Sequence, residues 1–498
     1  MAIIGRMRHS RIAAATCAAA VAIGGGIAAQ GVRTADDRSV LDQIRREGTE
    51  RSQVMTAFDQ FVTVIGARLT GSPAHKQAAD WARDTFARWG LANSHLEAWE
   101  FGRGWVLDGQ VIEMLEPRYM PLIGYAEAWA APTKSEINGT PIMIGGRSAA
   151  DVGAMRDKLA GAIVLTQPIQ TGFVREDRPQ PTASDAPVRI GAPPMPRPAG
   201  APTQADARQI QQTLRGAGVG VLLRPSAGEH GTVFVLGRDQ GENAVPSMVL
   251  AAEHYNMIAR MLQQGLPVKL RVGIKSRFLT SDTNSYNAIA DLPGTDPALR
   301  DQVVVLGAHL DSWHSGAGAS DNGHGAAAVM EAARILHAIG VRPRRTIRFA
   351  LWGGEEQGLL GSKAYVRQHL EGPANAKARD NLAVYLNLDA GMGPIYGWYS
   401  ENNAAAKSLF DRWLEPLRDL GMRRNILPGI GNTDHLSFKA AGVPGFNPIE
   451  DYTTYDVRTH HTNVDMYERV RAEDLKQNAI VLAWFAYNAS MMDGMFPR

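Results

Sequence analysis

The stretch AHLDSWHSGAGASDNGHGAAAV (308–329) decides the fold of this chain and points to its chemistry. It follows the apolar run VVVLGA (303–308) and leads into GAAAVMEAARILHAIG (325–340), whose apolar residues recur at helical spacing. The stretch therefore connects a buried strand to a helix, and this connection holds His309, Asp311 and Asp321. These are residue types that bind metal ions or transfer protons.

The strand, loop and helix pattern repeats downstream. TIRFALWG (346–353) precedes GLLGSKAYVRQHL (358–370), and LAVYLNLD (382–389) is a third continuous apolar run. Such runs alternating with helices predict an α/β fold, in which a mostly parallel mixed sheet is sandwiched by helices. Upstream, TGSPAHKQAADWARDTFARWG (70–90) predicts a helix that begins after the N-cap Ser72.

Metal-capable side chains follow each of the three predicted strands, where ligands bind in open sheets of this kind. They are His309, then the pair Glu355 and Glu356, and then Asp389; HHTNVD (460–465) adds a fourth group. One such residue alone is more often a surface residue or a helix cap. Their joint placement at one sheet edge favours a metal site.

The composition of the 498-residue chain, with 45% apolar and 20% charged residues, is typical of a soluble globular protein with two domains. Residues 1–29 carry three Arg, no acid and a short apolar run, which predicts a signal peptide cleaved after Ala29. An uncleaved membrane anchor is the less favoured alternative. We therefore expect a secreted or periplasmic protein without membrane association after cleavage.

Cys17 is the only cysteine and lies within this segment. The mature chain would then have neither disulfides nor thiolate ligands, so that a metal site must use His, Asp and Glu. Removing the three Arg changes the net charge of +2 to about −1, which leaves no basic excess for nucleic acid.

Short β-like runs separated by Gly and Pro predict a β-rich insert at 119–275 between two parts of a catalytic domain, 38–118 and 276–498. Within it, residues 175–203 are dense in Pro and predict an extended loop. A lid and a plain surface excursion are both open interpretations of this loop.

Five motifs in this order resemble the co-catalytic zinc exopeptidases, which include secreted bacterial aminopeptidases and plasma glutamate carboxypeptidase. They are GAHLDSW, SDNGHGAAAVMEAARIL, GGEEQGLLGSKAY, NLDAG and HHTNVD, with TGSPAHKQAADWAR as the matching upstream part. The insert is similar to a protease-associated domain at KLAGAIVLTQ and GAGVGVLLRP.

The resemblance implies two Zn²⁺ per chain. It makes His309 and Asp389 ligands of one ion, Glu356 and His461 ligands of the other, and Asp321 the bridge between both. This set agrees with zinc chemistry, because two ions about 3.5–4 Å apart need a shared anionic ligand to offset their repulsion.

Three further residues receive catalytic or supporting roles. Glu355 is the expected general base, which takes a proton from the attacking water and delivers it to the leaving amine. Asp311 is expected to accept the second imidazole N–H of His309. His460 stands where some relatives have a Tyr that donates to the tetrahedral intermediate.

The surrounding residues are assigned more loosely. Trp313 and His314 are candidates for the substrate mouth, and His324 is expected on the loop surface. Asp465 could support the His461 segment or cap the following helix. Tyr452 and Tyr455 are expected mainly to pack, whereas Asp434 and His435 are candidates for substrate contact or local capping.

These features predict a secreted di-zinc metallo-exopeptidase that hydrolyses terminal peptide bonds of short peptides or dipeptides. The choice among aminopeptidase, carboxypeptidase and dipeptidase stays open, and a homodimer is compatible with the sequence. The alternatives are an inactive transferrin-receptor-like binding protein and a single-zinc glutaminyl cyclase. The full ligand set disfavours the first, and the retained His309 disfavours the second.

Overall fold

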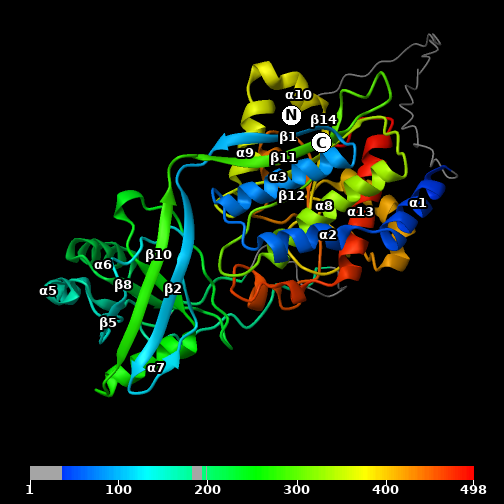
Figure 1. Cartoon of the computed structure of the whole chain (residues 1–498). Coiled ribbons are helices and arrows are strands. Elements are labelled where there is room, and N and C mark those ends of the chain that lie inside the picture. Colours follow the sequence, from blue (N-terminus) through cyan, green and yellow to red (C-terminus); the bar gives the residue numbers. More distant parts are fainter. Residues whose placement is uncertain (1–35, 182–192, 198) are drawn as a thin grey trace, which may run out of the picture.

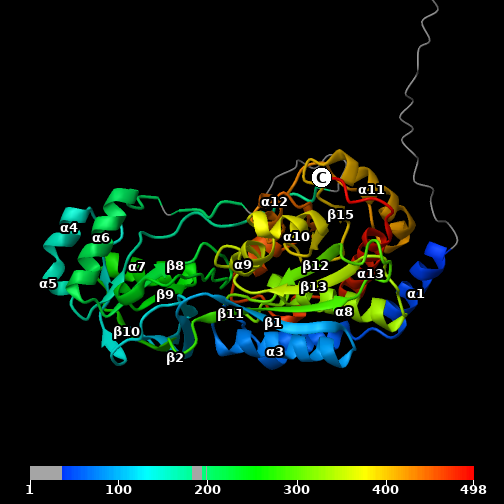
Figure 2. The same cartoon turned by 90° about the horizontal axis from the view of Figure 1, so that it is seen from above.

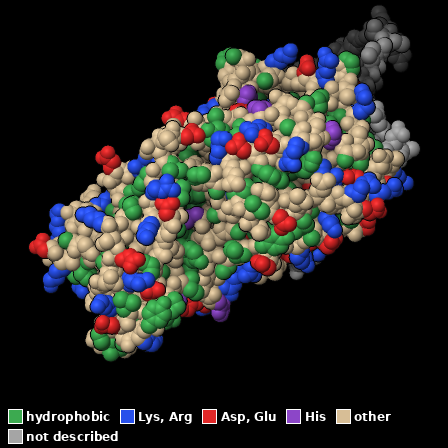
Figure 3. Space-filling model, viewed as in Figure 1, with side chains coloured by type: hydrophobic (Ala, Val, Ile, Leu, Met, Phe, Trp, Pro, Cys, Tyr) green, Lys and Arg blue, Asp and Glu red, His purple; other side chains and the backbone are tan. Residues whose placement is uncertain are grey.

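The computed structural model describes residues 36–181, 193–197 and 199–498, so the predicted signal peptide lies outside the described residues. The chain forms two lobes, as Figure 1 shows: a larger lobe, which we call the catalytic domain after its predicted role, and a smaller inserted lobe. Acidic and basic side chains are interspersed over the face in Figure 3, as expected for a chain with a small net charge. Among the described residues, no helix has both the length and the apolar character needed to cross a bilayer.

A six-stranded mixed sheet forms the centre of the catalytic domain. Its spatial order is β1 (Ala92–Glu100), β11 (Asn284–Leu292), β13 (Thr346–Trp352), β12 (Val303–His309), β14 (Leu382–Asn387) and β16 (Gly445–Phe446). The last four strands run parallel, whereas β1 and β11 are antiparallel to their neighbours. The predicted mostly parallel mixed sheet is therefore confirmed.

Helices cover both faces of this sheet. Apolar side chains of the central strands point alternately to the two faces, so each face needs helices to form a core. Val304 and Leu306 of β12 belong to a large core, and Val305 belongs to a second, smaller core on the other face. The large core includes residues of α1 (Asp36–Glu50), α2 (Val54–Asp59), α3 (Pro73–Arg88), α8 (His324–Ala338), α11 (Ala404–Leu414) and α13 (Ala472–Met491). The second core includes residues of α9 (Leu360–His369) and α12 (His435–Ala440).

Shorter elements connect these layers. They are η1 (Gln60–Ile65), η3 (Ala319–Gly323), η4 (Pro373–Asn375), α10 (Ala376–Asn381), β15 (Gly397–Trp398), η5 (Glu415–Leu420), β17 (Pro448–Ile449), η6 (Tyr455–Thr459) and η7 (Tyr467–Arg469). The start of α3 follows its sequence signals, since the Ser72 side chain accepts a hydrogen bond from the backbone N–H of His75 and Pro73 is the first helical residue.

The inserted lobe extends from the catalytic domain on a long two-stranded ribbon, β2 (Gly104–Glu116) paired with β10 (Lys269–Leu279) (Figure 1). β3 (Met120–Pro121) and β5 (Ile137–Gly139) flank this ribbon. A separate five-stranded sheet has the order β4 (Gly124–Ala126), β9 (Ser247–Leu250), β8 (Val221–Pro225), β7 (Ile163–Leu165) and β6 (Ile142–Met143).

This lobe also contains helices that the sequence analysis did not predict. They are α4 (Ala149–Ala154), α5 (Arg156–Leu159), α6 (Gln204–Ala217) and α7 (Ala252–Gln263), together with the short turn η2 (Gly241–Asn243). The signals for α6 were present, because Thr203 caps its start and Gly218 ends it in the left-handed conformation.

Arg68, fully buried between α2 and α3, fixes the long connection from β12 to α8. Its guanidinium donates hydrogen bonds to five backbone carbonyl oxygens, at 2.7–3.0 Å. Three of these carbonyls, those of Leu310, Ala317 and Gly318, belong to the connection itself. A single side chain thus holds the loop that carries the predicted ligand Asp321.

We predict that Arg68→Met destabilises the catalytic domain severely. Each buried carbonyl left without a donor costs about 1–3 kcal/mol, so the free energy of unfolding should fall by at least about 3 kcal/mol. Urea unfolding followed by fluorescence measures this loss. The matched control is Arg83→Met on α3, whose guanidinium pairs with Asp80 and Asp84 near the surface and should contribute less than about 1 kcal/mol. Equal unfolding midpoints for the two variants would contradict the assigned role.

Candidate metal centre

The five predicted metal ligands come from five separate strand ends or loops and meet at the carboxyl edge of the catalytic sheet. His309 is the last residue of β12, and Asp321 lies in η3 before α8. Glu356 follows β13, Asp389 follows β14, and His461 follows η6 near the C-terminus. The parallel strands β12, β13 and β14 bring His309, Glu356 and Asp389 to one edge, because the carboxyl ends of these strands point the same way.

Their side chains approach one another closely. The Nε2 atom of His309 lies 3.3 Å from Oδ1 of Asp321 and 3.5 Å from Oδ1 of Asp389. The Nε2 atom of His461 lies 3.4 Å from Oδ2 of Asp321 and 2.9 Å from Oε2 of Glu356. Asp321 therefore presents one oxygen to each imidazole.

These separations match those of atoms that bind a common ion. Two donors that each lie about 2.0–2.2 Å from one tetrahedral zinc ion are roughly 3.3–3.6 Å apart. Three of the four measured distances fall within or near this range, and the fourth is shorter. A cavity of about 10 Å³, roughly the space of one water molecule, lies among Asp321, Glu356 and His461.

Unpaired buried atoms and excess negative charge provide a further test of whether cations fit. Nε2 of His309, Oδ2 of Asp321 and Oε1 of Glu356 are buried without a hydrogen-bond partner. The cluster also contains more carboxylates than imidazoles, and buried charges are costly unless they are paired or bind metals. The residues therefore fit divalent cations held by nitrogen and oxygen.

Mutual electrostatics shifts the pKa of each group. Burial alone would lower the pKa of His309, yet the carboxylates of Asp389, Asp311 and Asp321 raise it well above its usual value. Burial and the neighbouring Asp321 raise the pKa of Glu356 to about 7. Despite burial, Glu356 and Asp321 raise the pKa of His461 to about 9. The carboxylates of the cluster therefore favour positive charge at the positions where cations would lie.

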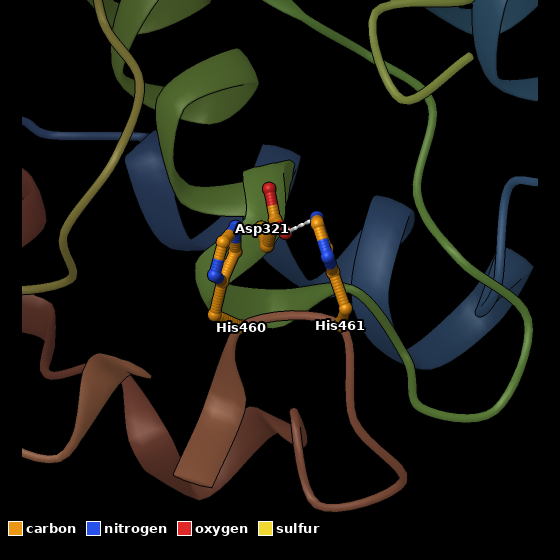
Figure 4. Close-up of side chains that lie close together, drawn as sticks. All are labelled: Asp321, His460 and His461. Atoms are coloured by element: carbon orange, nitrogen blue, oxygen red, sulfur yellow. Dashed lines mark ion pairs between the residues drawn. The ribbon is translucent and has the colours of Figure 1, made fainter. Parts of the chain in front are cut away.

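Glu355 and His460, both given catalytic roles from the sequence, lie against the ligand cluster. A carboxylate oxygen of Glu355 lies within 4.8 Å of donor atoms of His309 and Asp389. A ring nitrogen of His460 likewise lies within 4.8 Å of donor atoms of Asp321 and His461. Figure 4 shows the carboxylate of Asp321 between the imidazoles of His460 and His461, with the ion pair between Asp321 and His461 drawn as a dashed line. Burial, with the nearby negative charges of Asp389 and Asp434, raises the pKa of Glu355 well above its usual value.

Asp311 supports the cluster differently from the prediction. Nδ1 of His309 lies 3.0 Å from the backbone carbonyl oxygen of Asp311, whereas its carboxylate is 3.6 Å away. The carboxylate instead accepts the backbone N–H groups of Glu355 and Glu356, at 3.2 and 3.3 Å, and the Thr70 hydroxyl at 2.8 Å. The reason is the turn after β12, which directs the carbonyl toward the imidazole and the side chain toward the neighbouring strand end.

Asp465 supports Asp321 rather than His461. Its carboxylate accepts the backbone N–H groups of Ser320 and Asp321, at 2.7 and 3.1 Å. The C-terminal segment thereby holds the backbone of the central ligand. Neither a helix cap nor a contact to His461 describes this role.

His324 is buried, so its expected place on the loop surface is wrong. Its Nε2 atom lies 3.1 Å from both carboxylate oxygens of Glu450, and Asn478 donates to the same carboxylate at 2.8 Å. As the first residue of α8, His324 points into the core, where the distant Glu450 compensates its polarity.

The other candidates have mostly structural partners. Trp313 lines the small cavity, whereas His314 is half-buried and its Nε2 atom lies 2.8 Å from the backbone carbonyl oxygen of Ala126 in the inserted lobe. Asp434 is buried and accepts the Ser362 hydroxyl at 2.5 Å, and His435 pairs with Glu401 at 3.1 Å. Tyr452 and Tyr455 are buried and pack, as expected. His314, Asp434 and His435 therefore belong to the framework around the centre.

Four residues that contact the loops of the site had no role predicted from the sequence, namely Arg68, Thr70, Arg178 and Asp456. Thr70 is the first residue of the motif at 70–83 and Arg68 lies two residues before it, so this motif offers a local signal for both. Arg178 and Asp456 form a buried ion pair with each other. Because they are 278 positions apart, no local sequence pattern indicates this pair.

Comparison with known proteins assigns a family to this arrangement. Residues 287–486, which include all five predicted ligands, match the model of Peptidase family M28. Residues 287–486 thus form a peptidase family M28 region. The predicted family and the metallopeptidase class are therefore confirmed for this chain.

Individual relatives extend the match over most of the chain. Carboxypeptidase Q from Bos taurus is 26% identical, covering 88% of this chain and 85% of the relative. Leupeptin-inactivating enzyme 1 from Streptomyces exfoliatus is 35% identical over 42% of this chain and 49% of its own length. The crystal structure of a Peptidase M28 precursor from Shewanella amazonensis is similar with a TM-score of 0.70 and 24% identity, covering 93% of this chain and 98% of that one. BSAP, a zinc aminopeptidase from Bacillus subtilis, has a TM-score of 0.58 at 18% identity, covering 88% and 95%.

We predict that Asp465→Asn weakens metal binding about 10–100-fold, the usual effect of removing a group that orients a ligand. The amide keeps one acceptor oxygen but turns an N–H₂ group toward the backbone donors of Ser320 and Asp321. Competition with a chromogenic chelator measures the affinity for Zn²⁺. Glu468→Gln, an exposed change three residues away, is the control and should bind as the unaltered chain does. An unchanged affinity in Asp465→Asn would contradict this role.

Proposed function

We propose that this protein is an exported two-zinc exopeptidase that hydrolyses terminal peptide bonds of short peptides. The observation that carries the proposal is the position of Asp321, whose two carboxylate oxygens face His309 and His461 at 3.3 and 3.4 Å. A carboxylate placed in this way serves two cations at once. The composition of residues 1–29 supports export.

Two sets of residues would hold the ions. His309 and Asp389 belong to one ion, Glu356 and His461 to the other, and Asp321 to both. When bound, zinc polarises the scissile carbonyl and lowers the pKa of water toward about 7. Bacillus subtilis BSAP, a zinc aminopeptidase with the same fold, supports the choice of metal.

Glu355 is the proposed general base. Its carboxylate lies beside His309 and Asp389 without being needed as a ligand. It accepts a proton from the water that attacks the carbonyl carbon and delivers this proton to the nitrogen of the leaving amine.

His460 is the proposed hydrogen-bond donor to the oxygen that becomes negative in the transition state. Its ring centroid lies 3.8 Å from that of His461, and Tyr455 stacks against it at 5.0 Å. A ring held on two sides loses little freedom on binding substrate, which suits it to a fixed donor position.

A narrow, covered site supports cleavage at chain ends. The cavity at the ligands is lined by Trp313 and Thr462 as well as by the predicted ligands, and a mid-chain bond would need an open groove. We infer that the inserted lobe, which we interpret as a protease-associated domain, contributes to this cover, because Trp129 of this lobe contacts Trp313 edge to face at 6.5 Å.

A panel of dipeptides and tripeptides, free or blocked at either end, tests the proposal. We expect cleavage that requires one free end, that a chelator abolishes and that Zn²⁺ restores. Elemental analysis should find two zinc ions per chain. Cleavage that persists in excess chelator would refute the metal mechanism, and equal cleavage of doubly blocked peptides would refute terminal specificity.

We predict that Glu355→Gln lowers kcat at least about 100-fold while both zinc ions remain bound, because a general base contributes about 10²–10⁴-fold. Gln keeps the size of the side chain but accepts no proton. Turnover of a dipeptide and metal content are measured on the same preparation. Glu371→Gln, the same substitution at an exposed glutamate just after α9, is the matched control and should retain activity. Near-normal kcat in Glu355→Gln would remove this residue from its role.

A further inference from the structure

The loop that carries His460 and His461 makes many of its backbone contacts with the inserted lobe. The backbone N–H of Val235 donates to the His461 carbonyl at 3.0 Å, and Phe234 forms a β-bridge with Thr462. Arg458, within η6, donates to the Thr232 hydroxyl and the Glu229 carbonyl at 2.8 Å. One strap from the lobe, residues 226–235, thus pairs with the loop on one side.

A second strap, residues 174–181, crosses from the inserted lobe to the other side of the same loop. Figure 2 shows the teal stretch after β7 running from the lobe to the catalytic domain. Asp177 accepts the backbone N–H groups of Thr454 and Val457 at 2.7 and 3.0 Å. Gln180 exchanges hydrogen bonds with the backbone of Glu450 and Tyr452 at 2.8 and 3.2 Å.

Arg178 is the central contact of this second strap. Its backbone N–H, Nε and Nη2 all donate to the Asp456 carboxylate, at 2.8, 2.9 and 2.6 Å. The side chains of Arg178 and Asp456 are 4% and 1% exposed, so this ion pair is secluded from water. The guanidinium also lies over the rings of Tyr452 and Tyr455, at 4.8 and 5.5 Å.

These contacts lead directly to the metal centre. Oδ1 of Asp456 lies 3.7 Å from Nδ1 of His460, whose ring stacks on Tyr455. His461, the next residue, has φ +63°, a left-handed conformation that a residue with a side chain keeps only when its surroundings enforce it. The catalytic domain contacts this loop as well, through Glu356 and Asp321 at His461, but both straps that pair with its backbone come from the inserted lobe.

We propose that Arg178 is a positioning residue that fixes His460 and His461 through Asp456, so that the inserted lobe completes the metal centre. Arg178 reaches neither substrate nor metal, since Asp456 and the two tyrosines surround its guanidinium. The bidentate geometry is specific to arginine, because a lysine ammonium matches only one carboxylate oxygen at a time. This inference rests on the proposed function for its kinetic consequence, but not for its structural one.

The test compares Arg178→Gln and Arg178→Lys in the full chain with the control Arg175→Gln. Arg175 lies on the same strap, and its pair with Glu229 is exposed at the surface. We expect Arg178→Gln to lower Zn²⁺ affinity or kcat about 10–100-fold, with a smaller change in KM and a smaller loss in Arg178→Lys. Hydrogen exchange of residues 452–463 in the metal-free chain should accelerate in both variants. Arg175→Gln should match the unaltered chain in each measurement.

Each outcome has a distinct meaning. Wild-type exchange, Zn²⁺ affinity and kcat in Arg178→Gln would overturn the proposal, as would equal effects in Arg175→Gln. If Arg178→Gln fails to fold, Arg178→Lys and the neutral pair Arg178→Gln/Asp456→Asn give the same readouts without a buried unpaired charge. If the unaltered chain cleaves no peptide, the proposed function fails, while Zn²⁺ affinity and exchange still decide the role of Arg178.

Discussion

The shared carboxylate of Asp321 is the contact on which the rest of the site depends. Its two oxygens face imidazoles that come from a central strand and from the C-terminal loop, at 3.3 and 3.4 Å. Because the two oxygens of a carboxylate are close together, both imidazoles must be positioned accurately relative to Asp321. The backbone at Asp321 must therefore be fixed as well. Arg68 meets this requirement through the carbonyls of the β12 to α8 connection, and Asp465 meets it through two backbone N–H groups.

Sequence patterns predict the sheet and the ligand edge because both follow from local periodicity. Continuous apolar runs mark β12, β13 and β14, and the parallel arrangement then forces their carboxyl ends to one edge. His309, Glu356 and Asp389 therefore converge without any knowledge of tertiary contacts. His461 is different, since no strand carries it to that edge, and only the family resemblance placed it among the ligands.

The polar contacts behind the ligands could not be predicted, because each joins segments far apart in the sequence. His324 is an example: its sequence neighbours are Gly, Asn and Ala, so nothing local indicates that the distant Glu450 will pair with it in the core. Asp311 shows a second limit. Asp311 is close enough to His309 in the sequence to accept a hydrogen bond from its imidazole. Only the backbone conformation decides whether the carbonyl or the carboxylate of Asp311 is the acceptor.

The inserted lobe supports the loop of His461 because irregular backbone needs hydrogen-bond partners from other segments. A segment with little regular structure must find partners for many of its N–H and C=O groups elsewhere. The segment from Glu450 to Asp465 contains only the short η6, and it finds several of these partners in the inserted lobe, through Asp177, Gln180 and Val235. Strands β2 and β10 continue from β1 and β11 of the catalytic sheet, so the lobe is anchored to the same framework that fixes His309. The inserted lobe thus connects the loop of His461 to the framework of the catalytic sheet.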